Sequence, residues 1–444
     1  MPSPTEHEAR ARESVVRALA EIPFYGRRAP KAPILPGDDL GAVLAKLPLL
    51  AKRDVRTTLP KQWVAAGRDV KGELASGDLE IVETGGGATE RVRILRDKGW
   101  WAAQDERAMR TNDRVAGTYD GGSPYKEAVL ATPLTGMNTC HAGDLGMAER
   151  SRGHRLWLNQ RPDPTYWLAE EMDRILDEIV AFGAHGLEAD PSYLALLARH
   201  ATARGRSIDV PGFVSLTYGL VTTADRRAID RVYAGPVVRK YGSVEAGVLF
   251  VEGPDGLLHH APVTTHVELL PARVPTPGAE GVALIVVTTL DRAAQPLVRY
   301  VVGDLGQVAR DTSSPTTGVP SLRTVEGRVD DALSLPSGAL VTSAAFDRGL
   351  AEGLASTDGI LVVQANQRTR ENVEIDLVLA TGTDEPKVLA DVRTVAARLL
   401  EGVDVTVRRT QAIAAEPGGE FRITKRHFPL DWAASFEGCE GFVP

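Results

Sequence analysis

Residues 284–290, with the sequence LIVVTTL, form a short run of apolar and β-branched side chains, and the segment LVRYVVGD follows at 297–304. A run of this length and composition is typical of a buried strand. Arg299 and Asp304 are therefore expected to flank the end of a strand or the turn after it. Around them, the interval 212–300 alternates apolar strands with short helices, which predicts α/β patterning with a sizeable sheet.

The rest of the chain supports a division into two parts. Strands are expected at 79–84 and 91–97, on either side of the glycine cluster 85–87, and helices are expected at 6–20, 39–46, 100–116, 165–182 and 191–204. After Asp331 the pattern changes to a compact α+β unit of about a hundred residues, with a helix at 386–401. We therefore place a domain boundary at Asp330, between residues 1–329 and 330–444.

Composition excludes several classes of protein. A chain of 444 residues is too long for one compact core. Its net charge of −8 argues against a broad nucleic-acid-binding face. Two cysteines provide no disulfide framework, the charged N-terminus is unlike a secretory signal, and the apolar runs are too short to span a membrane. We expect a cytoplasmic protein with no nucleic-acid or membrane partner, and a homodimer is one option for its oligomeric state.

Asp304 and Arg328 form the first candidate site. A carboxylate fixed after a strand can accept two hydrogen bonds from a ribose diol, and a nearby guanidinium can hold a phosphate or the same ribose. Together they suggest a nucleotide site across a domain joint. The alternative is structural, because Gly303-Asp304 is also typical of a turn and Gly327-Arg328 of a solvated loop.

Two further segments could bind phosphates. The loop Thr84–Thr89 (TGGGAT) would let backbone amides approach an anion, although a hairpin turn is the simpler interpretation. The segment 241–245 (YGSVE) combines a glycine turn with a hydroxyl and a carboxylate, as a magnesium–phosphate site requires. It also fits a strand-to-helix turn with Glu245 at the start of the helix.

As an ordered set, these segments resemble the adenylate-forming superfamily, in particular its phenylacetate-CoA ligase-like branch. The similarity runs through roughly residues 15–345 and continues more weakly to the end. The segments that carry it are IPFYGRR, LPLLAKRDVR, TGGGAT, YGSVE, TTLDRAAQPLVRYVVGDL and GRVDD.

The resemblance implies a fold and a set of roles. The fold is α/β, with a large N-terminal adenylate-forming domain of mixed β-sheets and flanking helices and a small, mobile C-terminal α+β domain that turns about Asp330. Glu245 would hold Mg²⁺ on ATP, Asp304 would bind the ribose and Arg328 would assist. The residues implied in ATP or AMP binding are Thr84, Gly86, Thr89, Tyr241, Gly242, Ser243, Asp304 and Arg328.

The chain departs from the family pattern in three places. Gly87, Ala88 and Thr89 replace the paired hydroxyls and glycine of the phosphate loop, and the following Glu90 would repel a triphosphate unless it points outward. The family's catalytic lysine lies in a Gly-Lys-x-Arg segment, whose lysine position here holds Glu420. His259 and His260 remain where some relatives bind zinc through cysteines, so we expect no structural zinc.

Lys425 is the better candidate for the missing lysine, with Arg422 as its substitute, although a solvated basic strand end is an equally good interpretation of this segment. The acyl pocket should be formed before YGSVE and by residues 135–147. Its candidate residues are Met137, His141, Tyr218, Tyr241 and Ala246.

The leading hypothesis is an ATP- and Mg²⁺-dependent ligase. It would adenylate a small carboxylic acid, with aromatic acids among the candidates, and pass the acyl group to CoA or another thiol or amine acceptor. Two alternatives stay open. The enzyme could adenylate a different oxyanion, such as nitrite in diazo formation, or the protein could be a nucleotide-binding relative whose ligase activity has decayed.

Overall fold

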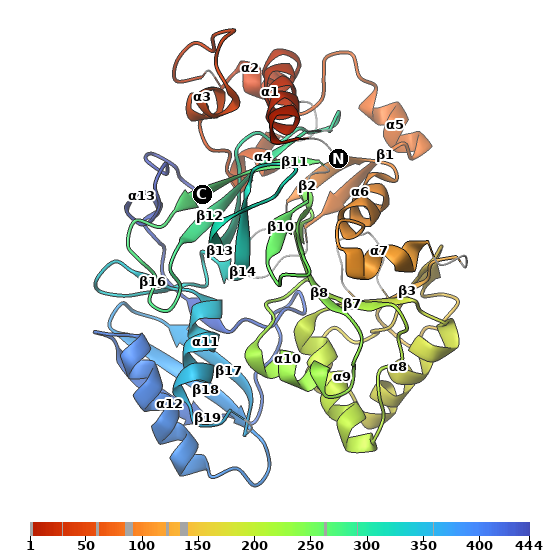
Figure 1. The fold of residues 1–444 in the computed structure, drawn as a ribbon, viewed down its shortest axis with the longest axis vertical. Coiled ribbons are helices and arrows are strands. Elements are labelled where there is room, and N and C mark those ends of the chain that lie inside the picture. Colours follow the sequence, from red (N-terminus) through yellow and green to blue (C-terminus); the bar gives the residue numbers. More distant parts are fainter. Residues whose placement is uncertain are drawn as a thin grey trace.

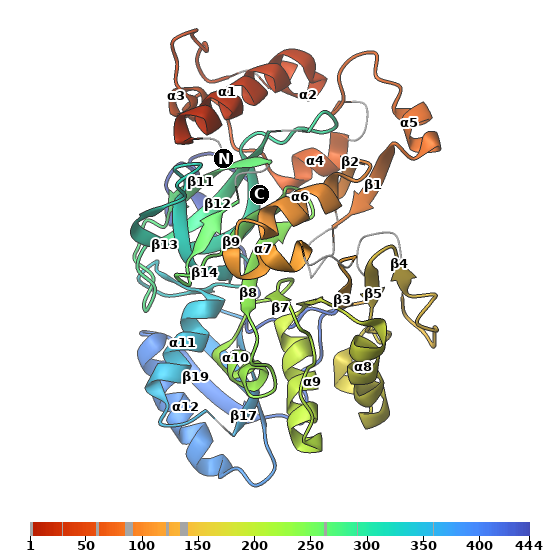
Figure 2. The ribbon, with the colours of Figure 1, turned by 45° about the vertical axis from the view of Figure 1, so that its right-hand side comes forward.

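The computed structural model describes residues 3–28, 30–58, 62–84, 92–120, 124–133, 141–261, 264–290, 292–357 and 359–444. A large sheet occupies the centre of the molecule (Figure 1), and a smaller lobe from the C-terminal part of the chain lies beside α9 and α10 (Figure 2). The glycine loop predicted at 85–89 and Met137 lie outside the described residues.

The central sheet has twelve strands in the order β11-β12-β13-β14-β10-β9-β8-β7-β6-β3-β5-β4. Neighbouring strands are antiparallel from β11 to β8 and parallel from β8 to β5, so the sheet is mixed, as predicted. The strands are β3 (Glu127–Leu130), β4 (Ser151–Arg152), β5 (Arg155–Trp157), β6 (Gly186–Ala189), β7 (Phe213–Leu216), β8 (Val237–Ser243), β9 (Gly247–Glu252), β10 (Leu258–His260), β11 (Thr265–Pro271), β12 (Val282–Thr289), β13 (Tyr300–Ser313) and β14 (Pro320–Arg328).

Strand β12 confirms the expectation of a buried strand, because all eight of its residues are buried. Ile285 and Val287 pack against the N-terminal helices α1 (Pro4–Glu21), α2 (Pro23–Gly26) and α3 (Leu40–Ala45). Leu284 and Val286 point the other way, into a second core cluster. This alternation is what the two-residue period of a strand requires when both faces are covered.

Helices cover both faces of the parallel half. On one face lie α8 (Ala169–Phe182), α9 (Pro191–Arg204) and α10 (Thr223–Asp230), with the turn η1 (Pro164–Tyr166) before α8. On the other lie α6 (Trp100–Met109) and α7 (Asp113–Tyr119). The parallel strands therefore end in a groove between helical layers, the place where α/β sheets usually bind ligands.

Two details differ from the sequence prediction. The single helix expected at 100–116 is two helices, because Asn112 caps the start of α7 by accepting a hydrogen bond from the backbone N–H of Arg114, at 2.8 Å. Among the described residues of 212–300, α10 is the one helix where several were expected. Below the N-terminal helices, α4 (Lys52–Thr58) and α5 (Val70–Ser76) lead into the hairpin β1 (Leu79–Glu83) and β2 (Arg93–Asp97).

The C-terminal lobe, defined here as residues 343–426, contains a separate four-stranded sheet in the order β19-β18-β17-β20. Its elements are α11 (Ser343–Gly353), β17 (Ile360–Gln367), β18 (Asn372–Leu379), α12 (Glu385–Leu399), β19 (Asp404–Arg409) and β20 (Thr424–Arg426). The short hairpin of β15 (Leu333–Ser334) and β16 (Leu340–Val341) precedes it. The lobe has its own core, and the domain boundary at Asp330 stays a prediction.

The last residues of the chain leave this lobe and return to the large sheet. Helix α13 (Trp432–Ser435) lies beside β11 and β12, far from α12 (Figure 1). Trp432, Phe436 and Cys439 are buried in the same cluster as Leu284 and Val286 of β12. We call residues 430–442 the C-terminal tail. No helix in the described part of the chain is long and apolar enough to cross a membrane.

Candidate active site

Two adjoining cavities lie at the carboxyl ends of β3, β6 and β7. The inner cavity has a volume of about 240 Å³, and the outer cavity, of about 750 Å³, extends toward the C-terminal lobe. The residues that line both include Tyr218, Lys240, Gly242, Asp304, Arg328 and Glu420. The shared wall brings together the aspartate, the arginine and the YGSVE segment that the sequence singled out.

Asp304 lies inside β13, directly opposite Arg328 of β14. The Asp304 Oδ1 atom is 3.8 Å from the Arg328 Nε atom, and its Oδ2 atom accepts a hydrogen bond from the Tyr241 hydroxyl at 2.9 Å. Burial raises the pKa of Asp304, and Arg328 and the Tyr241 hydroxyl oppose that rise. The arrangement is a fixed, desolvated carboxylate at a cavity wall, the geometry needed to accept hydrogen bonds from a diol.

Glu245 lies in the turn between β8 and β9, so it does not start a helix. Its Oε1 atom accepts a hydrogen bond from the Tyr300 hydroxyl at 2.9 Å and is 3.9 Å from the Lys52 Nζ atom. Gly242 is required by close packing, because a Cβ atom there would lie 2.4 Å from the Gly247 carbonyl oxygen. The sequence predicted Glu245 but assigned no role to Lys52, although Lys52 lies in the segment LPLLAKRDVR that carries part of the resemblance.

Thr84 ends the hairpin of β1 and β2 at the inner cavity. Its hydroxyl accepts a hydrogen bond from the backbone N–H of Val92 at 3.0 Å, and its own N–H donates to the Val92 carbonyl at 2.9 Å. The strand–loop–strand context expected for the glycine cluster is therefore confirmed. Gly86 and Thr89 lie outside the described residues.

A buried ionic network forms the deep wall of the inner cavity, and sequence reasoning missed it. Lys240 pairs with Glu188 and, at 2.8 Å, with Asp105, while Arg155 pairs with Glu127 at 2.7 Å and Asp105 at 3.0 Å. Burial alone would lower the pKa of Lys240, but the carboxylates around it outweigh burial and raise that pKa. Burial raises the pKa of Glu127 to about 6. The five residues come from five separate elements, so no sequence pattern marks them.

The substrate-pocket candidates lie at different depths. Tyr218 lines both cavities, donates a hydrogen bond to Glu188 and has a φ of 72°, an uncommon backbone conformation for this residue type. Ala246 is buried beside the site. His141 is buried behind the cavity wall, where it stacks on Trp157 with ring centroids 4.8 Å apart. Trp157 itself lines the inner cavity, as does Trp101.

The C-terminal lobe contributes the loop Gly418–Glu420 to the inner cavity. The Gly419 carbonyl accepts a hydrogen bond from the Tyr193 hydroxyl at 2.7 Å, which anchors the loop on α9. Glu420 thus lies among the site residues at the position where the resemblance implies a lysine. Burial raises its pKa, while Arg328 and Lys52 oppose that rise.

The two basic residues that the sequence suggested in this lobe, Lys425 and Arg422, both form ion pairs. Lys425 forms an ion pair with Glu416 and is absent from the described lining of either cavity. Arg422 lines the outer cavity and pairs with Asp331, next to the predicted hinge residue Asp330. Arg299 has a structural role, because it pairs with Glu268 at 2.9 Å and donates to the Leu47 carbonyl at 2.7 Å.

The described residues of the site offer a metal ion only a few protein ligands. No group of three or more His, Cys, Asp or Glu side chains in the described ranges is arranged to hold a metal ion. Glu245 can still act with substrate oxygens, because Mg²⁺ in nucleotide sites needs only one or two carboxylates and takes its other ligands from phosphates and water.

Comparison with solved structures identifies the fold. 2-Hydroxyisobutyryl-CoA ligase in its postadenylation state matches with a TM-score of 0.67 and 16% identity, over 96% of this chain and 90% of that chain. The same ligase in its thioesterification state gives 0.53 and 16%, over 95% and 90%. The amide bond synthetase McbA from Marinactinospora thermotolerans gives 0.50 and 17%, over 88% and 72%. This chain has the fold of these adenylate-forming ligases. Scans against protein-family models and against curated proteins find no match.

Proposed function

We propose that this protein is an ATP-dependent ligase that adenylates a small carboxylic acid and transfers the acyl group to a nucleophile. The observation that carries the proposal is the desolvated Asp304, held between Tyr241 and Arg328 at a cavity wall. A half-buried carboxylate with a raised pKa that faces an open cavity is a functional-site candidate, because its desolvation costs stability unless a ligand offsets that cost.

The roles follow from position. Asp304 accepts hydrogen bonds from the ribose hydroxyls, and Arg328 lies beside it. Along the nucleotide cleft lie Tyr241, Gly242 and Ser243 of β8, with Thr84 at its inner end. Glu245 would hold the Mg²⁺ that accompanies ATP. A carboxylate oxygen of the acid attacks the α-phosphorus, the bond to the bridging oxygen breaks, and pyrophosphate leaves with that electron pair. Positioning and charge neutralisation supply most of the rate in such a step.

Lys52 supplies a cation that the C-terminal lobe does not. Its Nζ atom is 3.9 Å from Glu245, in the wall of the inner cavity, whereas Lys425 is paired away from the cavities. We infer that Lys52 neutralises phosphate charge in this chain. Lys425 and Arg422 stay candidates for an arrangement of the lobes other than the present one, with Asp330 as the hinge.

The size of the inner cavity favours a small acid. Its volume of about 240 Å³ has to hold the acid next to the α-phosphate, and Trp101 and Trp157 line it, which suits a compact aromatic or aliphatic acid. The size of the inner cavity does not distinguish CoA, another thiol and an amine as acceptors. The solved structures include ligases that use CoA and an amide bond synthetase, which supports transfer in general.

The arrangement of the lobes supports the adenylation step in particular. The chain superposes better on the postadenylation state of 2-hydroxyisobutyryl-CoA ligase, with a TM-score of 0.67, than on its thioesterification state, with 0.53. A rival function, nucleotide binding without ligase activity, is favoured by one observation: Glu420 lies where the resemblance implies the catalytic lysine.

Pyrophosphate release tests the proposal. Purified protein is incubated with ATP, Mg²⁺ and a panel of small acids, including nitrite, and acid-dependent release of pyrophosphate is expected for at least one of them. ATP binding without release for any member would favour the rival function, and release with nitrite alone would favour the oxyanion alternative.

Asp304→Ala is the first variant to measure. We expect it to lower kcat/KM for pyrophosphate release roughly 30- to 150-fold. This corresponds to a loss of about 2–3 kcal/mol of transition-state stabilisation, because a charge-assisted hydrogen-bond acceptor for the ribose is lost. Asp311→Ala, an exposed residue of the same strand β13, is the control and should leave release unchanged. Near-normal turnover of Asp304→Ala would mean that the carboxylate has only a structural role.

A further inference from the structure

Among the described residues, Glu420 has no ion-pair partner, whereas most other charged side chains of the cleft form ion pairs. No salt bridge or side-chain hydrogen bond joins it to any residue in the described part of the chain, although Arg328, Lys52, Asp304 and Glu416 are all close enough to influence its charge. Its loop is held by the hydrogen bond from Tyr193 to Gly419, and it lines both cavities. A largely desolvated carboxylate is costly unless a ligand supplies the missing cation.

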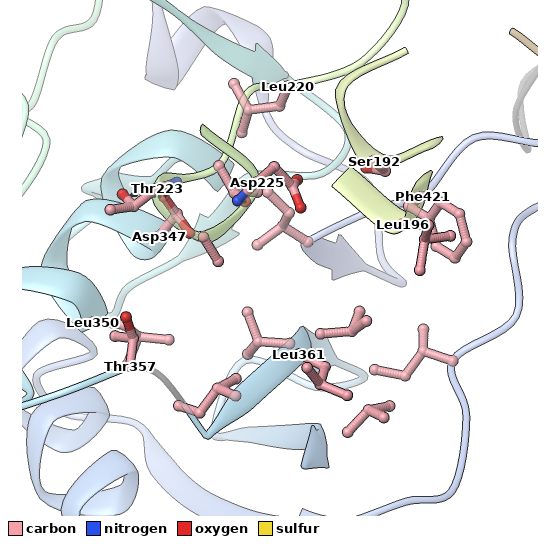
Figure 3. A pocket seen from close by; sticks show the side chains of 18 of the residues that line it. Ser192, Leu196, Leu220, Thr223, Asp225, Asp347, Leu350, Thr357, Leu361 and Phe421 are labelled. Atoms are coloured by element: carbon pink, nitrogen blue, oxygen red, sulfur yellow. Dashed lines mark hydrogen bonds between the residues drawn. The ribbon is translucent and has the colours of Figure 1, made fainter. Parts of the chain in front are cut away.

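A third cavity, which we call the interlobe cavity, is lined by Phe421, the neighbour of Glu420 in the chain. It has a volume of about 300 Å³ and lies between α9, α10, α11 and β17. Figure 3 shows Leu196, Leu361 and Phe421 around its apolar part, with Asp225 and Asp347 on one side. Such a cavity suits the apolar part of a small molecule.

The interlobe cavity adjoins the outer cavity. Leu220, Thr223, Asp347, Phe421 and Arg422 line both of them. Phe421 follows Glu420 directly in the chain, and Glu420 lines the outer cavity that adjoins this apolar space. A molecule that fills the interlobe cavity with its apolar part can therefore present a polar head to Glu420, at the edge of the nucleotide cleft.

The C-terminal lobe is attached to the large sheet at both of its ends. Residues 328–332 enter it from β14, and the tail leaves it and pairs with the end of β11 through the bridge of Ala272 with Phe436. Two hydrogen bonds secure this contact, from Arg273 N–H to the Ser435 carbonyl at 2.9 Å and from Glu437 N–H to the Pro271 carbonyl at 3.0 Å. The lobe is therefore joined to the large sheet at both of its ends.

We propose that the interlobe cavity and Glu420 form the acceptor site of this enzyme, and that the acceptor is a primary amine with an apolar body. This inference rests on the proposed function for its chemistry, but not for its binding. The apolar body lies against Leu196 and Phe421, and the ammonium head pairs with Glu420.

The chemical step is balanced within the site. Glu420 takes a proton from the ammonium group and leaves a neutral amine. The amine nitrogen then attacks the acyl carbon of the adenylate, forming the C–N bond while the bond from that carbon to the phosphate oxygen breaks. AMP leaves with the electron pair, and the second proton lost from nitrogen passes to solvent.

The charges around Glu420 favour an amine over a thiol. Arg422 is neutralised by Asp331 and Lys425 by Glu416. The other charged groups that act on Glu420 are Lys52 and Arg328 against Asp304 and Asp190, so that with Glu420 itself two cations face three carboxyl groups. A cationic head is attracted by this excess, whereas the thiolate that attacks in thioester formation is repelled.

Equilibrium binding tests the site without any turnover. Calorimetry with the full-length protein compares hexylamine with hexanol, which has the same apolar body and no charge. We expect the wild type to bind hexylamine roughly tenfold or more tightly than hexanol, and Glu420→Gln to lose that preference while still binding hexanol. If Asp347→Asn loses the preference for hexylamine and Glu420→Gln keeps it, the ammonium head lies at the far side of the cavity and the proposal is overturned. Equal binding of hexylamine and hexanol by the wild type would also overturn it.

Transfer is tested with an acid that supports pyrophosphate release. Relative to the pyrophosphate that it releases, Glu420→Gln should form about 100-fold less hexylamide than the wild type, with partial recovery in Glu420→Asp. Leu196→Trp, which fills the interlobe cavity, should reduce transfer to hexylamine but not to hydroxylamine, and Ala203→Trp on the exposed side of α9 should affect neither. The inference would be refuted if Glu420→Gln formed the hexylamide as fast as the wild type does. It would also be refuted if the wild type preferred CoA to hexylamine as the acceptor.

The two proposals fail separately. If no acid supports pyrophosphate release, the proposed function is wrong, and the comparison of hexylamine with hexanol still decides whether Glu420 and the interlobe cavity bind an amine. If release occurs without Glu420-dependent binding or transfer, the proposed function stands and the acceptor site lies elsewhere.

Discussion

Asp190 is a buried carboxyl that caps α9 and also lines the inner cavity. Its Oδ1 atom accepts hydrogen bonds from the backbone N–H groups of Ser192 and Tyr193, at 2.9 and 3.4 Å. Burial raises its pKa to about 7, although the two hydrogen bonds oppose the rise. The folded protein therefore keeps a proton on Asp190 at pH values where the unfolded chain, with a pKa of about 3.9, has lost it.

This difference predicts how Asp190→Asn changes stability with pH. Between about pH 4 and pH 7 the wild type loses stability as the pH rises, because its folded state binds the extra proton, and above pH 7 the whole penalty applies. The asparagine keeps the cap without the charge. Relative to the wild type, the variant should therefore gain up to about 4 kcal/mol between pH 4 and pH 8. Denaturant unfolding at several pH values measures this, and a pH-independent difference would contradict it.

Lys52 makes a second prediction at this scale. Lys52→Gln should lower kcat/KM for pyrophosphate release by roughly 10- to 100-fold, because a cation next to Glu245 is lost from the nucleotide cleft. Lys71→Gln, in the exposed part of α5, is the matched control and should behave as the wild type. If both variants release pyrophosphate equally fast, the neutralising charge comes from another residue.

At the scale of elements, the loop Gly418–Glu420 depends on a glycine. Gly419 has a φ of 89°, and a Cβ atom there would lie 2.6 Å from both the Thr132 and the Tyr193 hydroxyl oxygens. The loop can approach α9 this closely only because the side chain is absent. This approach is what places Glu420 in the cleft.

Gly419→Ala should therefore displace the loop. We expect a loss of about 1–3 kcal/mol of unfolding free energy, through the left-handed backbone and the steric contact together, and a loss of the charge preference for hexylamine. Gly117→Ala, in α7 with no atom within 4 Å of the added carbon, should be neutral or slightly stabilising. Thermal unfolding and calorimetry of the two variants test this, and unchanged binding by Gly419→Ala would show that the loop tolerates a side chain.

At the scale of the whole molecule, the C-terminal tail joins the two parts of the chain. Trp432 packs against Phe436 and Phe442, with ring centroids 5.9 and 5.4 Å apart, in the cluster that covers one face of β12. The tail therefore stabilises the large sheet and limits the C-terminal lobe at the same time.

Trp432→Ala should release this constraint. The lost burial costs about 3–5 kcal/mol, enough to detach the tail from the sheet. Faster hydrogen exchange in residues 430–442 is expected, together with easier proteolysis between β20 and α13. Glu437→Ala, at an exposed position of the same segment, should exchange as the wild type does. If exchange is unchanged in Trp432→Ala, the tail is held by its backbone bonds alone.

The sequence by itself determined those features that depend on local pattern. The apolar run at 284–290 predicted a buried strand, and the patterns at 191–204 and 386–401 predicted the helices α9 and α12 to within two residues, because neighbouring residues decide such patterns. Arg328 and Glu245 were identifiable because they lie at the end or turn of a patterned strand, whereas Asp304, expected at a strand end, lies inside β13.

Only the tertiary structure decided which residues meet. Lys52 reaches Glu245 across nearly two hundred residues of chain, and the network of Lys240, Glu188 and Arg155 joins elements with no shared motif. In the sequence, Glu420 was noted only because it occupies the position of the family's lysine. In the fold, it is an unpaired carboxylate that lines two cavities. Contacts of this kind depend on packing between distant elements, and no local pattern encodes them.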